Sequence, residues 1–345
     1  MQRLRTLLLS KGKGRLFMQK KALITGLAGQ DGSYLAELLL AEGYEVHGIV
    51  RRAALEDTTH KLKNISHLTD RIQLHVASLD NVLSLIKTVR DVVPDECYHL
   101  AASSFVSYSF EDEISILNNN VNSTHYLLAA LKEFAPQCRF YFAGTSEMFG
   151  TVALAPQDAD TPFNPRSIYG ISKVSGYHLV KNYRSQYGMF ACSGILYNHE
   201  SPRRGYEFVT RKIVSSAVRI KMGLQENLTL GNLDAYRDWG YAPDYVRAMW
   251  LMLQAEKPED YVVASGETHS VREFVEIAFA AVDLDYAKFV QVDPVFFRPA
   301  EKVQLCGNPA RIIERLKWQR TRSFQEIVRE MVSSEQALYA EGRGR

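Results

Sequence analysis

The segment 21–42 constrains the fold of this chain more than any other stretch. A short apolar run, Lys21–Thr25, leads straight into a turn with glycines at positions 26, 29 and 32, and a helical pattern, Gly32–Glu42, follows. Glycines at such a turn let the backbone approach a pyrophosphate, which accepts hydrogen bonds from the free N–H groups of the helix N-terminus. The order of strand, glycine turn and helix predicts the first unit of a dinucleotide-binding fold. For the glycine trio taken alone, a purely structural turn is the alternative.

Short apolar runs alternate with longer helical patterns through the amino-terminal half of the chain. The predicted strands are Lys21–Thr25, Glu45–Val50, Arg71–Val76, Glu96–Ala101, Arg139–Ala143 and Ala191–Leu196. The predicted helices between them are Gly32–Glu42, Val82–Val92, Asn120–Phe134 and Ile171–Tyr187. Because each helix is long enough to cross back over a sheet, the alternation predicts an α/β fold with a Rossmann-type doubly wound parallel sheet.

The pattern changes after about Asn198, where a loop rich in charge and proline precedes the apolar helix Phe208–Met222. A later apolar helix, Tyr245–Gln254, is expected to return to the first lobe. We therefore expect a flexible tail over 1–17, a Rossmann domain over 18–198 plus about 233–262, and a smaller C-terminal α/β substrate lobe over about 199–232 plus 263–345. An amphipathic targeting helix is the less favoured interpretation of the tail.

Charge and cysteine usage exclude several classes of partner. The net charge is only +2 and no basic block lies beyond the amino-terminal tail, so neither nucleic acid nor a membrane surface is expected. The four cysteines stand far apart without a Cys-x-x-Cys spacing, which argues against a zinc or other metal site and against a disulfide scaffold. No apolar run reaches the roughly 20 residues that cross a bilayer. These features predict a cytoplasmic protein whose ligand is a small charged metabolite.

The end of the second predicted strand indicates which dinucleotide is bound. An acidic residue at this place takes the ribose hydroxyls of NAD, but the chain has Arg51 and Arg52 there. A guanidinium pair suits the 2′-phosphate of NADP, so NADP is the predicted cofactor. The alternative is two solvated arginines at a strand end.

Polar residues gather where predicted strands end, which is the edge at which doubly wound sheets bind ligands. They are Thr145, Ser146 and Glu147 after one strand, Ser103 and Ser104 after another, and Tyr169 and Lys173 at the start of a helix.

Tyr169 and Lys173 are one helical turn apart and share a face. The ammonium group, together with a nearby nicotinamide charge, is expected to lower the pKa of the phenol so that it can act as a base. Glu147 is suited to remove a proton α to a ketone, and Thr145 to hydrogen-bond the reacting hydroxyl. An exposed helix pair and a solvated loop acid are the alternatives.

With these residues in place, the sequence resembles the extended short-chain dehydrogenase/reductase superfamily, and within it the GDP-mannose 4,6-dehydratases. The resemblance runs from Lys20 to Arg320. It rests on the stretches Ala22–Ala36, Thr145–Gly150, Gly194–Gly205, Phe208–Lys212, Arg237–Gly240 and Phe297–Glu301.

The resemblance implies a cycle in which Tyr169 takes the C4 hydroxyl proton as hydride passes to NADP⁺, Glu147 removes the C5 proton, water leaves C6, and hydride returns to C6. Together with the motifs above, it assigns cofactor contacts to Gly26, Gly29, Gln30, Asp31, Gly32, Arg51, Arg52, Ser78, Leu79, Leu100, Ser104, Tyr169, Lys173, His199 and Arg204. It assigns substrate contacts to Ser104, Ser146, Glu147, Asn198, Lys212, Arg237, Arg298 and Glu301. The arginines and Lys212 also suit a diphosphate clamp on chemical grounds.

Several alternatives stay open at this point. A GDP-heptose would need only more room around the sugar, and a ketoreductase or epimerase of the same superfamily would share the Tyr/Lys pair. A protein that binds NADP without turnover would need neither Tyr169 nor Glu147. We expect a homodimer or a homotetramer. Ser115 stands where the family often has a tyrosine near subunit contacts, which weakens the case for a tetramer and leaves a dimer through the helices Asn120–Phe134 and Ile171–Tyr187.

Overall fold

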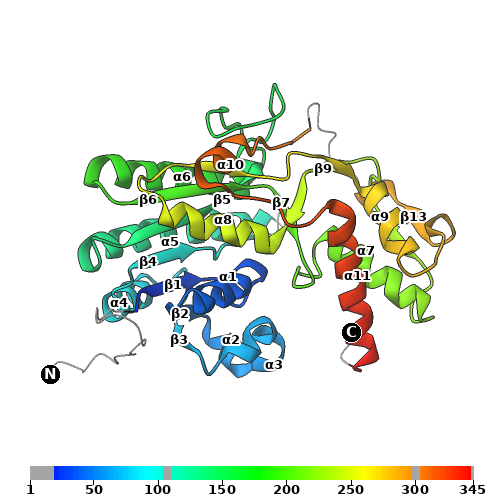
Figure 1. Ribbon diagram of the computed structural model, residues 1–345, viewed down its shortest axis with the longest axis horizontal. Helices are drawn as coiled ribbons and strands as arrows, with labels where there is room; N and C mark the ends of the chain where they lie inside the picture. The colour runs from blue at the N-terminus through cyan, green and yellow to red at the C-terminus, as the bar shows by residue number, and fades with distance from the viewer. Residues whose placement is uncertain (1–18, 104–109, 297–303, 343–345) are drawn as a thin grey trace.

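Seven parallel strands form the central sheet of the protein (Figure 1). The computed structural model describes residues 19–103, 110–296 and 304–342. The strands follow the order β11-β6-β5-β4-β1-β2-β3 across the sheet. Their bounds are β1 Lys21–Thr25, β2 Glu45–Val50, β3 Ile72–Val76, β4 Glu96–His99, β5 Arg139–Thr145, β6 Ala191–Leu196 and β11 Tyr261–Val263.

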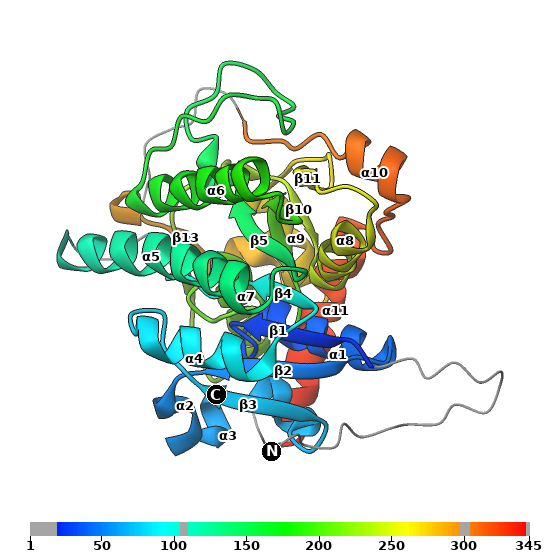
Figure 2. The same cartoon turned by 90° about the vertical axis from the view of Figure 1, so that its left-hand side faces the viewer.

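Helices cover both faces of this sheet, which explains why its strands are nearly continuous apolar runs. The helices α4 (Val82–Val92), α5 (Phe110–Phe134) and α6 (Ile168–Tyr187) pack their apolar residues on one face. The helices α1 (Gln30–Ala41) and α8 (Ala242–Gln254) pack together on the other. Figure 2 shows α5 and α6 lying side by side in front of the strands.

The chain reverses its direction of winding between β1 and β4, which are neighbours in the sheet. From β1 it proceeds outward through β2 and β3, and then returns to place β4, β5 and β6 on the opposite side. In open α/β sheets, ligands bind outside the carboxyl ends of the strands at such a reversal. The topology therefore points to the ends of β1 and β4 as the centre of a site.

A second hydrophobic core lies beside the sheet, at the right of Figure 1. It is built by α7 (Val209–Lys221), α9 (Val271–Ala280) and α11 (Phe324–Ala340), with Trp239 stacked on Phe324. Three pairs of short strands accompany it: β7 (Asn198–Glu200) with β10 (Trp239–Tyr241), β9 (Tyr236–Arg237) with β12 (His269–Ser270), and β8 (Leu228–Leu230) with β13 (Val290–Val292). The β8–β13 pair belongs to this core.

The Rossmann-type fold class predicted from the alternation is confirmed, and every predicted strand belongs to the sheet. Residues 52–68, for which no helix was predicted, form α2 (Arg52–Glu56), α3 (Thr58–Lys61) and a 3₁₀ helix, η1 (Lys63–Leu68). The division into two lobes stays a prediction, and α10 (Ala310–Leu316) buries Ile312 against the core of the large sheet. The proposed tail over 1–17 lies outside the described residues.

No helix among the described residues is both long and apolar enough to span a bilayer. Within the same ranges, no group of three or more His, Cys, Asp or Glu side chains could hold a metal ion.

Candidate active site

The turn between β1 and α1 has the backbone geometry that a bound pyrophosphate requires. Gly26 has φ of 76°, and a Cβ atom there would lie 2.9 Å from the backbone nitrogen of Ala101. A Cβ atom on Gly32 would lie 2.3 Å from the carbonyl oxygen of Gly26. The helix begins after Gly29 without a side-chain cap, so its first N–H groups are left for an external acceptor. The turn therefore fits a dinucleotide.

Asp31, in the first turn of α1, forms an ion pair with His199 of β7. Asp31 Oδ2 lies 2.8 Å from His199 Nε2, and His199 Nδ1 donates a hydrogen bond to the carbonyl oxygen of Tyr197 at 2.7 Å. Burial alone would lower the pKa of His199, but the Asp31 carboxylate outweighs it and the pKa is raised. The structure thus ties the predicted cofactor residues Asp31 and His199 to each other, and the same turn holds Gln30, which donates to the carbonyl oxygen of His199 at 3.1 Å.

Arg204 lies in the loop after β7, beside a buried carboxylate. Its Nε is 3.3 Å from Glu200 Oε2, and its guanidinium lies over the ring of Phe208 with 3.6 Å to the ring centroid. Glu200 also accepts a hydrogen bond from Thr210 Oγ1 at 2.5 Å. Burial raises the pKa of Glu200, and the charge of Arg204 opposes this shift. Arg204 is therefore held on the carboxyl side of the sheet, where a cofactor contact was expected.

The adenosine side of the expected cofactor site lies at the ends of β2 and β3. Arg51 and Arg52 are both exposed at the start of α2, and neither guanidinium group has a hydrogen bond or an ion pair to another described residue. Ser78 and Leu79 follow β3 and are partly buried, and Leu100 follows β4. Ser104 lies outside the described residues. The structure thus leaves both guanidinium groups accessible to an anion.

The start of α6 packs closely against the end of β5, and this contact brings together Thr145, Glu147 and Tyr169. Thr145 is the last residue of β5, and its Oγ1 accepts a hydrogen bond from the backbone N–H of Glu147 at 3.3 Å, which starts a short 3₁₀ helix, η2 (Ser146–Met148). At the start of α6, a Cβ atom on Gly170 would lie 2.7 Å from the carbonyl oxygen of Glu147. This close approach places Tyr169 beside Glu147, and the Tyr169 side chain is hydrogen-bonded to Thr145.

Lys173 lies behind Tyr169 and is 3% exposed. Its Nζ donates to the carbonyl oxygen of Ala143 in β5 at 2.8 Å and lies 5.8 Å from the ring centroid of Tyr169. Burial lowers the pKa of Lys173 to about 7. Burial and then the negative charge of Glu147 raise the pKa of Tyr169 in the chain alone, whereas the lowering expected from the sequence also needs a nicotinamide charge. The difference arises because the amine is desolvated and bonded to the backbone, so in the chain alone it does not stabilise the phenolate.

The sequence did not mark Asn120 as part of the site, where it was only the expected start of a helix. Asn120 is 4% exposed and accepts from the backbone N–H of Ser103 at 3.0 Å. Its amide donates to Ser172 Oγ at 3.0 Å, and Ser172 Oγ donates to the carbonyl oxygen of Tyr169 at 2.7 Å. Asn120 thus links the loop after β4 to the first turn of α6. Its only sequence signal is a run of three asparagines in a helical pattern.

The expected substrate residues lie along the boundary between the two cores. Asn198 is in β7, paired with Trp239, and Ser146 is buried in η2. Lys212 is exposed on α7, donates to the carbonyl oxygen of Thr229 at 2.8 Å, and lies 5.6 Å from the ring centroid of Phe296. Arg237 ends β9. Arg298 and Glu301 lie outside the described residues.

A Tyr/Lys pair at the carboxyl edge of a doubly wound sheet, next to a glycine turn that fits a dinucleotide, defines an enzyme of the extended short-chain dehydrogenase/reductase class. The model of the GDP-mannose 4,6 dehydratase family matches residues 23–331. GDP-mannose 4,6 dehydratase 2 of Arabidopsis thaliana is 46% identical over 329 residues, which cover 93% of this chain and 88% of the relative. The chain belongs to the GDP-mannose 4,6-dehydratase family.

Two solved structures share the fold. RMD from Pseudomonas aeruginosa, complexed with NADPH, has a TM-score of 0.77 and 24% identity and covers 93% of this chain and 98% of its own. dTDP-glucose 4,6-dehydratase from Bacillus anthracis, in complex with NAD, has a TM-score of 0.79 and 20% identity and covers 92% of this chain and 97% of its own. At 20–24% identity, these two structures show a shared fold and nothing further about this chain.

Proposed function

We propose that this protein is an NADP-dependent GDP-mannose 4,6-dehydratase that converts GDP-mannose to GDP-4-keto-6-deoxymannose. The observation that carries the proposal is the close approach of Gly170 to the carbonyl oxygen of Glu147, which sets a carboxylate beside a Tyr/Lys pair. A simple reductase has no need of a carboxylate at this place, because it removes no proton α to a ketone. The names of the relatives support the same substrate.

In this proposal each residue has one task. Tyr169 accepts the proton of the C4 hydroxyl, and Thr145, already hydrogen-bonded to it, orients that hydroxyl. Lys173 lies close enough to stabilise the phenolate once a further positive charge is near, since the chain alone raises the pKa of Tyr169. Glu147 removes the C5 proton and passes it to the C6 hydroxyl, which leaves as water. When bound, the nicotinamide supplies the hydride acceptor at C4 and the hydride donor at C6. Gly26, Gly29, Gly32 and the uncapped N-terminus of α1 hold its pyrophosphate.

Incubation of the protein with NADP and GDP-mannose, followed by mass spectrometry, tests the proposal. We expect the sugar nucleotide to lose the mass of one water with no net consumption of the cofactor. A parallel incubation with a GDP-heptose tests the alternative substrate. If only the GDP-heptose loses water, the substrate is a GDP-heptose and not GDP-mannose. Reduction of a keto sugar without loss of water would support a ketoreductase.

The preference for NADP over NAD depends on the two exposed arginines at the end of β2. Arg51→Asp combined with Arg52→Ser should weaken NADP binding by about tenfold or more, because charge-assisted hydrogen bonds to a 2′-phosphate are lost. The affinity for NAD should change little. Calorimetric titration of both cofactors checks this, with Arg71→Ser, an exposed arginine just before β3, as the matched control. Equal affinities of the unmodified protein for NADP and NAD would contradict the prediction.

We also propose that the protein is a cytoplasmic homo-oligomer, either a dimer or a tetramer. Large apolar side chains are exposed on the two helices expected to form a dimer, namely Ile114 and Phe134 of α5 and Ile171 and Tyr187 of α6. Contact with a second subunit would bury these side chains. No nucleic acid and no membrane is proposed as a partner, in keeping with the net charge of +2.

A further inference from the structure

Asp238 is a buried carboxylate at the junction of three chain segments. It follows Arg237 at the end of β9 and is 1% exposed. One oxygen, Oδ1, accepts from the backbone N–H of Ser265 at 2.8 Å and from Ser265 Oγ at 2.7 Å. The other, Oδ2, accepts from the backbone N–H groups of Gly266 and Gly307, both at 3.1 Å. These four donors surround the Asp238 carboxylate, and we call this arrangement the cradle of Asp238. Hydrogen bonds to a charged carboxylate are stronger than the same number of bonds between neutral groups.

Each of the three segments comes from a different part of the molecule. The first, β9 to β10, carries Arg237 and pairs with β12 on one side and β7 on the other. The second, 264–268, connects β11 of the large sheet to β12. The third, 304–309, passes over the edge of the sheet near Gln157. Asp238 is therefore the point at which the position of Arg237 is fixed relative to the large sheet.

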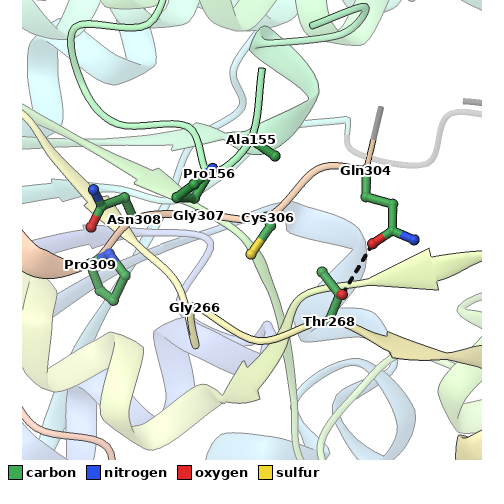
Figure 3. A pocket seen from close by; sticks show the side chains of 9 residues that line it. All are labelled: Ala155, Pro156, Gly266, Thr268, Gln304, Cys306, Gly307, Asn308 and Pro309. Atoms are coloured by element: carbon green, nitrogen blue, oxygen red, sulfur yellow. Dashed lines mark hydrogen bonds between the residues drawn. The ribbon is translucent and has the colours of Figure 1, made fainter. Parts of the chain in front are cut away.

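Side-chain packing joins these segments only in part: Ala264 and Leu305 belong to one buried apolar cluster. Residues of 155–156, 266–268 and 304–309 line a hollow of about 370 Å³, and no charged side chain is among them. Figure 3 shows these lining residues. Across the hollow, Thr268 Oγ1 donates to Gln304 Oε1 at 3.2 Å. The segments approach closely at Gly307, where a Cβ atom would lie 2.3 Å from Ala264 Cβ. Asp238 joins the two segments by accepting from the backbone N–H groups of Gly266 and Gly307. Gln157 holds the other side of 304–308 through hydrogen bonds of its own.

We infer that Asp238 is a positioning residue for binding of the GDP-sugar: its carboxylate sets where Arg237 presents its guanidinium to the diphosphate. The inference rests on the proposed function, in which Arg237 contacts the GDP portion of the substrate. The catalytic residues lie on β5, η2 and α6, and none of them contacts the cradle. Loss of Asp238 should thus reduce binding of the GDP portion and leave the chemical steps intact.

The variant Asp238→Asn tests this with little change in shape. An amide can accept through one oxygen only, so its NH₂ group faces donors that it cannot bond. We expect the KM for GDP-mannose and the Kd for GDP to rise by roughly 10- to 100-fold, with kcat and the affinity for NADP nearly unchanged. Steady-state kinetics gives the first pair of values and calorimetry with GDP and with NADP gives the second.

Asp244→Asn is the matched control, because Asp244 is another buried carboxylate that accepts two hydrogen bonds, from the backbone N–H and the Oγ1 of Thr321, away from the cradle. This variant should lower thermal stability without raising the KM. An equal rise in KM for both variants, or a fall in kcat with unchanged KM in Asp238→Asn, would overturn the inference.

Ser265→Ala provides a second, milder variant if Asp238→Asn does not fold. It removes one of the four donors and should raise the KM and the Kd for GDP in the same direction by a smaller factor. An unchanged Kd for GDP in this variant would then reject the positioning role. If the unmodified protein does not dehydrate GDP-mannose, the proposed function fails, whereas the calorimetric comparison with GDP still decides the role of Asp238.

Discussion

Tyr169→Phe should bind NADP⁺ and GDP-mannose normally and yet form reduced nicotinamide only very slowly. In the proposed mechanism the variant lacks the hydroxyl that takes the C4 proton, so hydride transfer from C4 loses its base. We expect the rate of oxidation to fall by about 10²- to 10⁴-fold, the range for a positioned acid–base group. Stopped-flow absorbance of the nicotinamide after mixing with GDP-mannose measures this step directly.

Tyr183→Phe is the matched control for this experiment. Tyr183 lies on the same helix, α6, and is also largely buried, but its ring packs against His125 and Tyr187 and takes no part in the site. This variant should keep the unmodified rate. Normal reduction of the cofactor by Tyr169→Phe would assign the base to another residue and would reopen the reductase alternative.

The pKa shifts of Tyr169 and Lys173 indicate that the pair is not ready to act as a base without a ligand. Without a ligand, burial lowers the pKa of Lys173 to about 7, and burial with the charge of Glu147 raises the pKa of Tyr169. Both shifts disfavour the ionised forms that the proposed chemistry requires. A bound positive charge near the phenol would reverse the shift of Tyr169. In the proposed mechanism, Tyr169 therefore needs the positive charge of the bound cofactor before it can act as a base.

Much of the sheet could be predicted because its strands are buried on both faces and read as apolar runs between turn residues. The same logic fails for residues 52–68, where α2, α3 and η1 are short and polar. They are attached to the rest of the fold by Ile65 and Leu68, which pack into the core of the sheet. The local sequence does not indicate this long-range contact. Similarly, α5 begins at Phe110 and not at the predicted Asn120. Its first turns are polar and show no apolar periodicity, so the sequence pattern did not reveal them.

The features of the site also differ in whether a local sequence pattern predicts them. Glycines and the Tyr/Lys spacing are local signals, and the structure places Gly26, Gly32, Tyr169 and Lys173 at one edge of the sheet, as expected. Pairings between distant segments could not be predicted, since no sequence pattern records which loops meet. The ion pair of Asp31 with His199 and the cradle of Asp238 are of this kind.

Glu147→Gln should stop the cycle one step later than Tyr169→Phe does. Its amide keeps the shape of the side chain but cannot take the C5 proton, so oxidation at C4 proceeds while elimination fails. We expect turnover to fall by about 10²- to 10⁴-fold. Reduced cofactor and a 4-keto hexose should then accumulate on the enzyme, and solvent deuterium should not enter C5. Stopped-flow absorbance and mass spectrometry of the quenched sugar measure the two effects.

The order of the two steps gives this prediction its sharpest test. If Tyr169 acts before Glu147, the double variant Tyr169→Phe with Glu147→Gln should behave like Tyr169→Phe alone, with oxidised cofactor and an unchanged sugar. Independent contributions would instead multiply the two losses. Turnover of Glu147→Gln at the unmodified rate would remove Glu147 from the chemistry. Because the backbone of Glu147 packs against Gly170, the substitution to glutamine leaves that contact intact, so a stalled keto sugar would report on the carboxylate and not on a displaced helix.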